Sequence, residues 1–199
     1  MPSALILIAD GTEEMEFTIT YDTLVRAGVS CTSAYVAAAD AASQNKTSPP
    51  CATGSRGINI LPDQQFSPQA AAAANYDLLV IPGGAKGAET IATNSPVQHL
   101  VREYLKENKY VGMICAGSMA AKTAGLPKQP LTSHPSVKAQ LEGDFEYSEE
   151  PVVVSGKLVT SRGPGTAFPF ALTLVELLCG KEKRGEVAGP MVFPPGTFA

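Results

Sequence analysis

The chain has 199 residues, of which 44% are hydrophobic, 15 are basic and 19 are acidic, so its formal net charge is −4. This length suits one α/β domain, and the excess of acid without a long basic block disfavours nucleic acids and anionic membranes as partners. The first apolar run, residues 4–9, is too short for a secretion signal or a membrane span. We therefore expect a single domain over residues 1–199, located in the cytoplasm, with the nucleus as a second compartment.

The four cysteines are spread along the chain as Cys31, Cys51, Cys115 and Cys179. No two of them form a CxxC pair, and no histidine stands at a zinc-ligand spacing from any of them. This pattern predicts separate reduced thiols rather than disulfides or a zinc site. We expect no metal and no other cofactor.

The first third of the chain begins with an alternation of strand and helix. Residues 4–9 are continuously apolar and are closed by Asp10 and Gly11, which is typical of a strand buried on both faces. Helical spacing of apolar residues follows over 13–28, and residues 29–37 predict a second strand. Residues 37–57 are small, polar and rich in proline and glycine, so they predict a long loop that exposes Cys51.

The middle of the chain repeats the pattern less regularly. A short strand is expected over 58–63, and the alanines of residues 67–77 predict a weak helix. Residues 76–84 and 110–117 each indicate an apolar strand that ends in glycine. A helix from about Pro96 has its apolar residues on one face, which leaves His99 on the surface.

The last third predicts a helix over 118–125, a hairpin around Ser155 and Gly156, and a long apolar helix over 166–180. Thr166 is the expected N-cap of that helix. The proline-rich residues 193–199 are expected to form a disordered tail.

Strands that alternate with helices predict a mainly parallel sheet with helices on both faces. In such sheets, ligands bind beyond the carboxyl ends of the strands. The loops at these ends carry Asp10, Pro82 to Gly84 and Cys115 to Gly117. We expect the three loops to converge.

Cys115 stands where a predicted strand gives way to a predicted helix, with Gly117 two residues further on. This arrangement is similar to a nucleophile elbow, in which the nucleophile lies on a strained turn. A helix N-terminus there would lower the pKa of the thiol and supply amides for an oxyanion. The alternative is a structural thiol, because cysteine is among the most buried residue types.

Five segments, residues 9–16, 80–84, 114–120, 132–135 and 160–166, closely resemble in order and spacing the motifs of the ThiJ/PfpI superfamily. The branch that they resemble most is the DJ-one branch of parkinsonism-associated redox and glyoxalase proteins, and the match runs from about residue 3 to about residue 192. The resemblance implies a flavodoxin-like three-layer α/β sandwich, a homodimer, and a catalytic cysteine at Cys115.

The resemblance also implies roles for other residues. Glu16 would meet the thiol and shuttle protons, although alone it would be interpreted as a solvated helix acid. The amides of Gly84, preceded by Gly83, and of Ala116 would hold an oxyanion, whereas a glycine pair can also be a plain turn. His134 would assist near the cysteine, or else only shape a turn.

Two further arginines match family positions near the site or the dimer contact. They are Arg26 and Arg56, and surface charge is the favoured explanation for Arg26. The sequence also departs from two related enzyme types. Ala116 stands where the protease-like branch has histidine, and His134 is followed by Pro135 and Ser136 rather than by the carboxylate of amidotransferases. A peptidase or a glutaminase is therefore disfavoured.

A cysteine paired with a glutamic acid suits aldehyde chemistry. The sequence predicts a glutathione-independent glyoxalase that converts methylglyoxal to D-lactate through a hemithioacetal on Cys115, with a related deglycase activity on glycated groups. Its partners would be small dicarbonyl aldehydes. The alternative is an oxidative-stress sensor or chaperone with little turnover, in which peroxide oxidises the same thiol beside Glu16.

Overall fold

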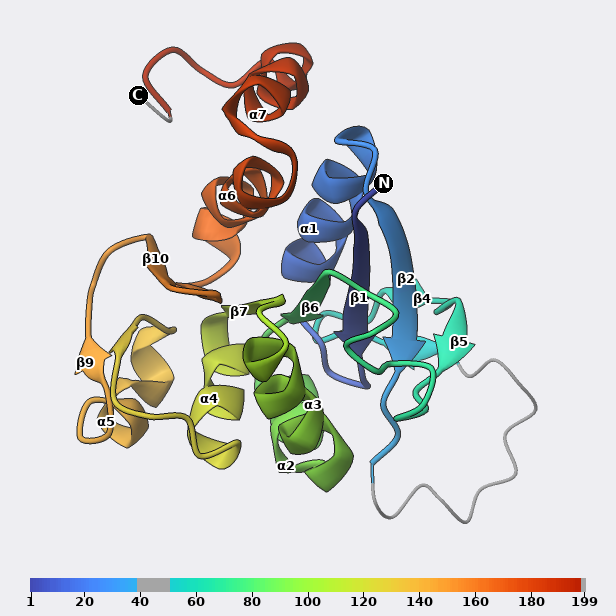
Figure 1. Ribbon diagram of the computed structural model, residues 1–199, viewed down its shortest axis with the longest axis vertical. Helices are drawn as coiled ribbons and strands as arrows, with labels where there is room; N and C mark the ends of the chain where they lie inside the picture. The colour runs from blue at the N-terminus through green and yellow to red at the C-terminus, as the bar shows by residue number, and fades with distance from the viewer. Residues whose placement is uncertain (39–50, 198–199) are drawn as a thin grey trace.

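The computed structural model describes residues 1–38 and 51–197, and its centre is a seven-stranded sheet (Figure 1). The strands lie in the order β10-β11-β7-β6-β1-β2-β5. All neighbours are parallel except β10 and β11, which form the expected hairpin. Their bounds are β1 (Ser3–Ile8), β2 (Ser30–Tyr35), β5 (Gln64–Gln65), β6 (Leu78–Ile81), β7 (Tyr110–Ile114), β10 (Val152–Ser155) and β11 (Leu158–Ser161).

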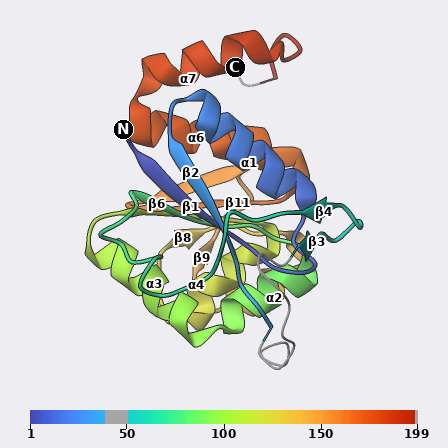
Figure 2. The ribbon, with the colours of Figure 1, turned by 90° about the vertical axis from the view of Figure 1, so that its right-hand side faces the viewer.

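Helices cover both faces of this sheet, which confirms the predicted α/β sandwich (Figure 2). One face carries α1 (Glu14–Arg26) and α6 (Ala167–Cys179), with α7 (Lys181–Ala188) following α6. The other face carries α2 (Ala85–Thr93), α3 (Ser95–Lys106) and α4 (Met119–Thr123). Because residues 4–8 of β1 and the whole of β6 are apolar, their side chains contribute to a separate hydrophobic core on each face.

Smaller elements lie around the sheet. A two-stranded antiparallel pair joins β3 (Ala52–Thr53) to β4 (Asn59–Ile60), and a parallel pair joins β8 (Pro130–Leu131) to β9 (Glu146–Tyr147). The remaining short helices are α5 (Lys138–Leu141), η2 (Cys115–Ser118), η3 (Pro135–Val137), η4 (Pro164–Thr166) and η5 (Gly189–Met191). Among the described residues, no helix is long and apolar enough to cross a membrane.

The predicted helix over residues 67–77 is wrong, because this segment forms turns. Its backbone oxygens are used by other groups: the buried Tyr104 hydroxyl donates to Ala71 O at 2.8 Å, and the Asn75 side chain donates to Gln69 O and Ala70 O. These contacts override the helical propensity of alanine. Helix α2, in contrast, was not predicted, because its short sequence includes Gly87 and has few large apolar residues.

Three further expectations concern loops and ends. The loop expected over 37–57 lies partly in residues 39–50, outside the described residues, and its last part contains β3. Cys51 is exposed, as predicted. Thr166 precedes α6, but its side chain does not cap the helix, since Oγ1 accepts from the amides of Arg162 and Gly163. In the expected tail, the Phe193 ring packs edge to face on Phe168 with centroids 5.0 Å apart.

Candidate active site

The loops after β1, β6 and β7 converge at one edge of the sheet, as predicted. The Glu13 amide at the start of α1 donates to Gly83 O at 3.0 Å, which ties the first loop to the second. The third loop fits closely against β6. A Cβ on Gly117 would lie 2.5 Å from Ile81 O and 2.7 Å from Pro82 O, so only glycine allows this approach.

Cys115 lies on a strained turn directly after β7. Its φ is +63°, a left-handed conformation that is uncommon for residues other than glycine, and it begins the short helix η2. Strained backbone of this kind clusters at functional sites, where the surrounding structure holds it in place. The elbow geometry that the sequence indicated is therefore present, and the thiol is partly buried.

Glu16 approaches the thiol from the first turn of α1. Its side chain is 0% exposed, and its Oε2 atom accepts a 2.7 Å hydrogen bond from the Gly83 amide. A Cβ added to Gly83 would lie 2.6 Å from Glu16 Oε2 and 2.9 Å from Cys115 Sγ. The carboxyl and the sulfur therefore meet across a position that only glycine can fill. Glu16 Oε1 is buried and has no hydrogen-bond partner among the described residues.

This environment raises both pKa values. Burial raises the pKa of Glu16 to about 7, and hydrogen bonds from the Gly83 amide and the Cys115 thiol oppose the rise. Burial also raises the pKa of the Cys115 thiol to about 12, and the charge of an ionised Glu16 adds to the effect. The predicted lowering of the thiol pKa is wrong, because desolvation and the neighbouring acid outweigh the nearby amides. The titrations of Glu16 and Cys115 are therefore coupled, so the two pKa values belong to the pair.

The amides that oppose this rise are those of Gly84 and Ala116. They are the two donors named from the sequence, and both are placed to hold negative charge at the sulfur or next to it. Gly84 has a φ of +84°, and a Cβ there would collide with Gly11 O and the Glu13 amide. A glycine is therefore required at position 84 for the turn that presents this amide.

His134 reaches Cys115 through its backbone. The His134 amide donates to Cys115 O at 3.3 Å, while the ring atom Nδ1 lies 2.8 Å from the Ser136 hydroxyl and 3.2 Å from the Ser136 amide. The ring therefore caps η3, which matches the turn role considered for it. The structure places His134 beside the cysteine, and direct assistance by its ring stays a prediction.

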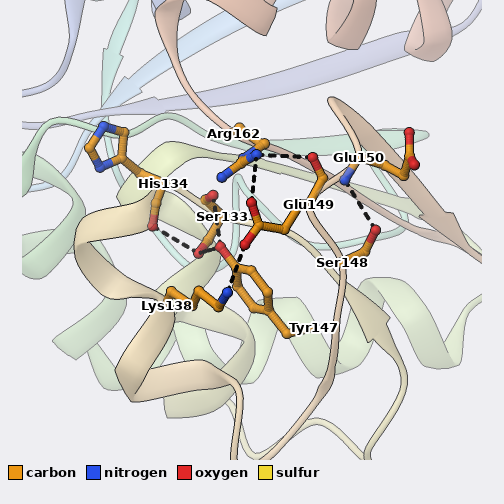
Figure 3. Close-up of polar contacts among 8 residues, drawn as sticks. All are labelled: Ser133, His134, Lys138, Tyr147, Ser148, Glu149, Glu150 and Arg162. Atoms are coloured by element: carbon orange, nitrogen blue, oxygen red, sulfur yellow. Dashed lines mark hydrogen bonds and ion pairs between the residues drawn. The ribbon is translucent and has the colours of Figure 1, made fainter.

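A polar network supports the segment that carries His134 (Figure 3). The Tyr147 hydroxyl lies 3.0 Å from Ser133 Oγ and donates to Ser133 O at 3.1 Å. Glu149 pairs with Lys138 at 2.6 Å and with Arg162 at 3.3 Å. The picture shows the His134 ring pointing away from these residues. The network therefore holds the backbone of the segment that carries His134.

Sequence reasoning missed the role of Glu13 and Glu14. Glu14 Oε1 accepts from the Arg56 amide at 2.6 Å and from the Ile58 amide at 3.3 Å, and the Ser55 hydroxyl contacts both carboxylates. These bonds lower the pKa of Glu14 against the effect of its burial. Acidic residues at a helix N-terminus interact favourably with the helix dipole, and this alone would explain Glu13 and Glu14. Nothing in the sequence indicates that they also bind the distant β3–β4 hairpin.

The two predicted arginines lie at the surface. Arg56 is exposed and donates through Nη1 to Ser55 O, so its backbone rather than its guanidinium is held by Glu14. Arg26 forms an exposed ion pair with Asp22 one turn earlier in α1, which agrees with the surface-charge interpretation. In the described ranges 1–38 and 51–197, no three His, Cys, Asp or Glu residues are grouped to hold a metal ion.

The raised pKa of Glu16 predicts a cost to stability. The folded protein keeps a proton on Glu16 that the unfolded chain releases between its usual pKa of 4.5 and about 7, so stability falls as pH rises through this window. Glu16→Gln should therefore raise the free energy of unfolding by about 3 kcal/mol at about pH 8 and have little effect near pH 4.5. Urea unfolding at both pH values tests this. The exposed control Glu150→Gln should show no such difference, and an equal response from both variants contradicts the assignment.

The contact across Gly83 predicts a second effect. Gly83→Ala places a methyl group against Glu16 and Cys115 and should destabilise the fold by about 1–3 kcal/mol, as overpacking does. Gly143→Ala is the matched control, because no atom lies within 4 Å of its added Cβ. Urea unfolding of the two variants gives the comparison. A Gly83 variant as stable as its control would show that the carboxyl and thiol are not in close contact.

The chain matches known proteins over nearly all of its length. Residues 2–177 match the DJ-1/PfpI family. The glutathione-independent glyoxalase DJ-1 of Schizosaccharomyces pombe is 39% identical over 98% of this chain and 100% of its own. The glutathione-independent glyoxalase DJR-1.2 of Caenorhabditis elegans is 35% identical over 95% of both chains. The solved structure of Schizosaccharomyces pombe DJ-1 superposes with a TM-score of 0.86 at 37% identity and covers 96% of this chain and 100% of that one. The sequence motifs, the fold and these relatives agree: the chain belongs to the DJ-1/PfpI family.

Proposed function

We propose that this protein is a glutathione-independent glyoxalase that converts methylglyoxal to D-lactate and glyoxal to glycolate. The observation that carries the proposal is the buried carboxyl of Glu16, held by the Gly83 amide opposite the Cys115 thiol. Two relatives at 35–39% identity over nearly the whole chain are named for the same activity, which supports it further.

In the first step, the sulfur of Cys115 adds to the aldehyde carbon of the substrate. Because the thiol pKa is about 12, the free thiolate is scarce, and an ionised Glu16 accepts the thiol proton as the new C–S bond forms. A base with a pKa of about 7 is well matched to this transfer near neutral pH. The oxyanion of the resulting hemithioacetal lies at the amides of Gly84 and Ala116.

In the second step, a proton moves between the two carbons of the substrate. Glu16 first gives the thiol's proton to the hemithioacetal oxygen and so becomes a carboxylate again. It then removes the proton from the former aldehyde carbon and delivers it through an enediol to the keto carbon, while the hydroxyl proton of the hemithioacetal moves to the keto oxygen, which gives a thioester of the hydroxy acid. Water then cleaves the C–S bond, releases lactate and restores the thiol. The aldehyde carbon is oxidised and the keto carbon reduced, so the electrons balance within the substrate. Addition of the thiol to a glycated group would use the same first step, and a deglycase activity is proposed on that ground.

A sensor without turnover would use the same thiol and the same carboxyl. Peroxide reacts with the thiolate, and the raised pKa keeps Cys115 protonated at neutral pH unless Glu16 takes its proton. The carbonyl chemistry uses that same proton transfer. This transfer therefore does not separate the two functions, and the two relatives named as glutathione-independent glyoxalases favour the enzyme.

The test is to incubate the protein with methylglyoxal without glutathione and to measure D-lactate with a stereospecific assay. Cys115→Ser and Glu16→Gln should each reduce kcat/KM by at least about 100-fold, whereas Glu150→Gln should retain it. The kcat/KM of the wild type should rise with pH through about 7, because Glu16 must be ionised to accept the proton. If the wild type makes no lactate over several turnovers, the proposal is wrong.

We also propose a homodimer, as the family resemblance implies. Met15 on α1 is 53% exposed and Ile58 is 58% exposed, and Glu14 binds the Ile58 amide, so both apolar side chains belong to neighbouring elements. Exposed apolar side chains on adjoining elements are typical of an association surface.

Sedimentation velocity should find the wild type as a dimer. Ile58→Glu should shift it toward monomer, because the new carboxylate would be buried in the contact. Val154→Glu, at a residue 47% exposed on the edge strand β10, is the control and should remain dimeric. A monomeric wild type, or a dimer unaffected by Ile58→Glu, would remove this surface as the contact.

A further inference from the structure

A cavity of about 390 Å³ lies beside the candidate active site. It is enclosed by α2 on one side and by α4, η3 and α5 on the other, and we call it the side cavity. Its lining includes Ala88, Ala92, Met119 and Val137, which make much of its wall apolar. The glyoxalase mechanism proposed above assigns no role to it.

The side cavity adjoins the groups proposed to hold the oxyanion. Ala116, whose amide is one of the two donors, lines it directly, and so does Ala85, which follows the second donor Gly84. Ser136 lines the same cavity and is bonded to the ring of His134. When the oxygen of the substrate's aldehyde is held by the Gly84 and Ala116 amides, the rest of the substrate has open space beside Ala116.

The volume exceeds what methylglyoxal needs. The volume of about 390 Å³ lies in the range of roughly 300–1,000 Å³ that is usual for small-molecule pockets, whereas methylglyoxal has only about five heavy atoms. Ligand pockets of this size are commonly apolar with a few polar groups that select the ligand. Glu89 is the ionisable residue of this lining, so a neutral substituent is favoured over an anionic one.

From these observations we infer that the side cavity binds the substituent on the keto carbon of α-oxoaldehydes that carry a bulky, neutral, apolar group. The inference rests on the proposed function and deepens it. The reaction remains R–CO–CHO + H₂O → R–CHOH–COOH, in which the aldehyde carbon is oxidised, the keto carbon is reduced, and no outside oxidant or reductant is needed. Phenylglyoxal, which yields mandelate, is the probe for this class.

The first test compares phenylglyoxal with methylglyoxal in the wild type and in Thr93→Trp. Thr93 is exposed at the end of α2 and lines the side cavity, so tryptophan can fill its mouth without disturbing the core. The wild type should favour phenylglyoxal by about tenfold in kcat/KM, and Thr93→Trp should abolish that preference while its methylglyoxal kinetics change by less than about twofold. His99→Trp, on an exposed face of α3, is the matched control and should keep the preference.

The second test changes the charge instead of the volume. The wild type should discriminate against 4-carboxyphenylglyoxal relative to phenylglyoxal, and Glu89→Gln should relieve this several-fold through KM with kcat unchanged. Methylglyoxal turnover distinguishes a failure of the proposed function from a failure of the side-cavity proposal. No lactate at all means that the proposed function has failed. Normal lactate production with no preference for phenylglyoxal, or with equal effects of Thr93→Trp and His99→Trp, overturns the inference about the side cavity alone.

Discussion

The hydrogen bond from the Gly83 amide to the buried carboxyl of Glu16 is the interaction on which the rest of the site depends. It joins the first turn of α1 to the end of β6, and it does so at the one place where the elbow after β7 passes close by. A carboxyl removed from water must be held by specific donors, or it would cost several kcal/mol to bury. Gly83 supplies the donor and, having no side chain, leaves room for Cys115 on its other side.

The surrounding contacts preserve this geometry by fixing backbone rather than side chains. Amide-to-carbonyl bonds run from Glu13 to Gly83 and from His134 to Cys115, and the buried Ser118 hydroxyl donates to Thr132 O at 2.9 Å. The strained φ of Cys115 persists because both neighbours of the elbow are held in this way. Besides burial, the groups that act on the thiol pKa are Glu16 and the amides of Ala116 and Gly84.

Much of this arrangement could be predicted from the sequence, and the missing parts have physical reasons. The apolar runs that became β1, β6 and β7 and the glycines after them indicate a parallel sheet whose loops meet at one edge. The family resemblance pointed to Glu16 and Cys115, which the structure brings together. The thiol pKa could not be predicted, because its direction depends on how deeply the sulfur is buried. Glu14 was missed because its partners, the amides of Arg56 and Ile58, lie more than forty residues away along the chain. The alanines of residues 67–77 predicted a helix that does not form, because the side chains of Tyr104 and Asn75 donate hydrogen bonds to backbone oxygens that a helix would use.

The two raised pKa values have a joint consequence that neither has alone. A thiol with a low pKa would react with any oxidant that reaches it. In this pair Glu16 ionises first, at a pKa of about 7, while the sulfur keeps its proton, so in the proposed mechanism a nucleophile forms only when the proton passes from sulfur to carboxylate. In the proposed mechanism the negative charge then moves to the oxygen of the bound carbonyl, which the Gly84 and Ala116 amides would hold. Substrate and nucleophile are therefore activated in the same event. Burial, which costs the fold stability when Glu16 ionises, is also what keeps the thiol protonated until an aldehyde is bound.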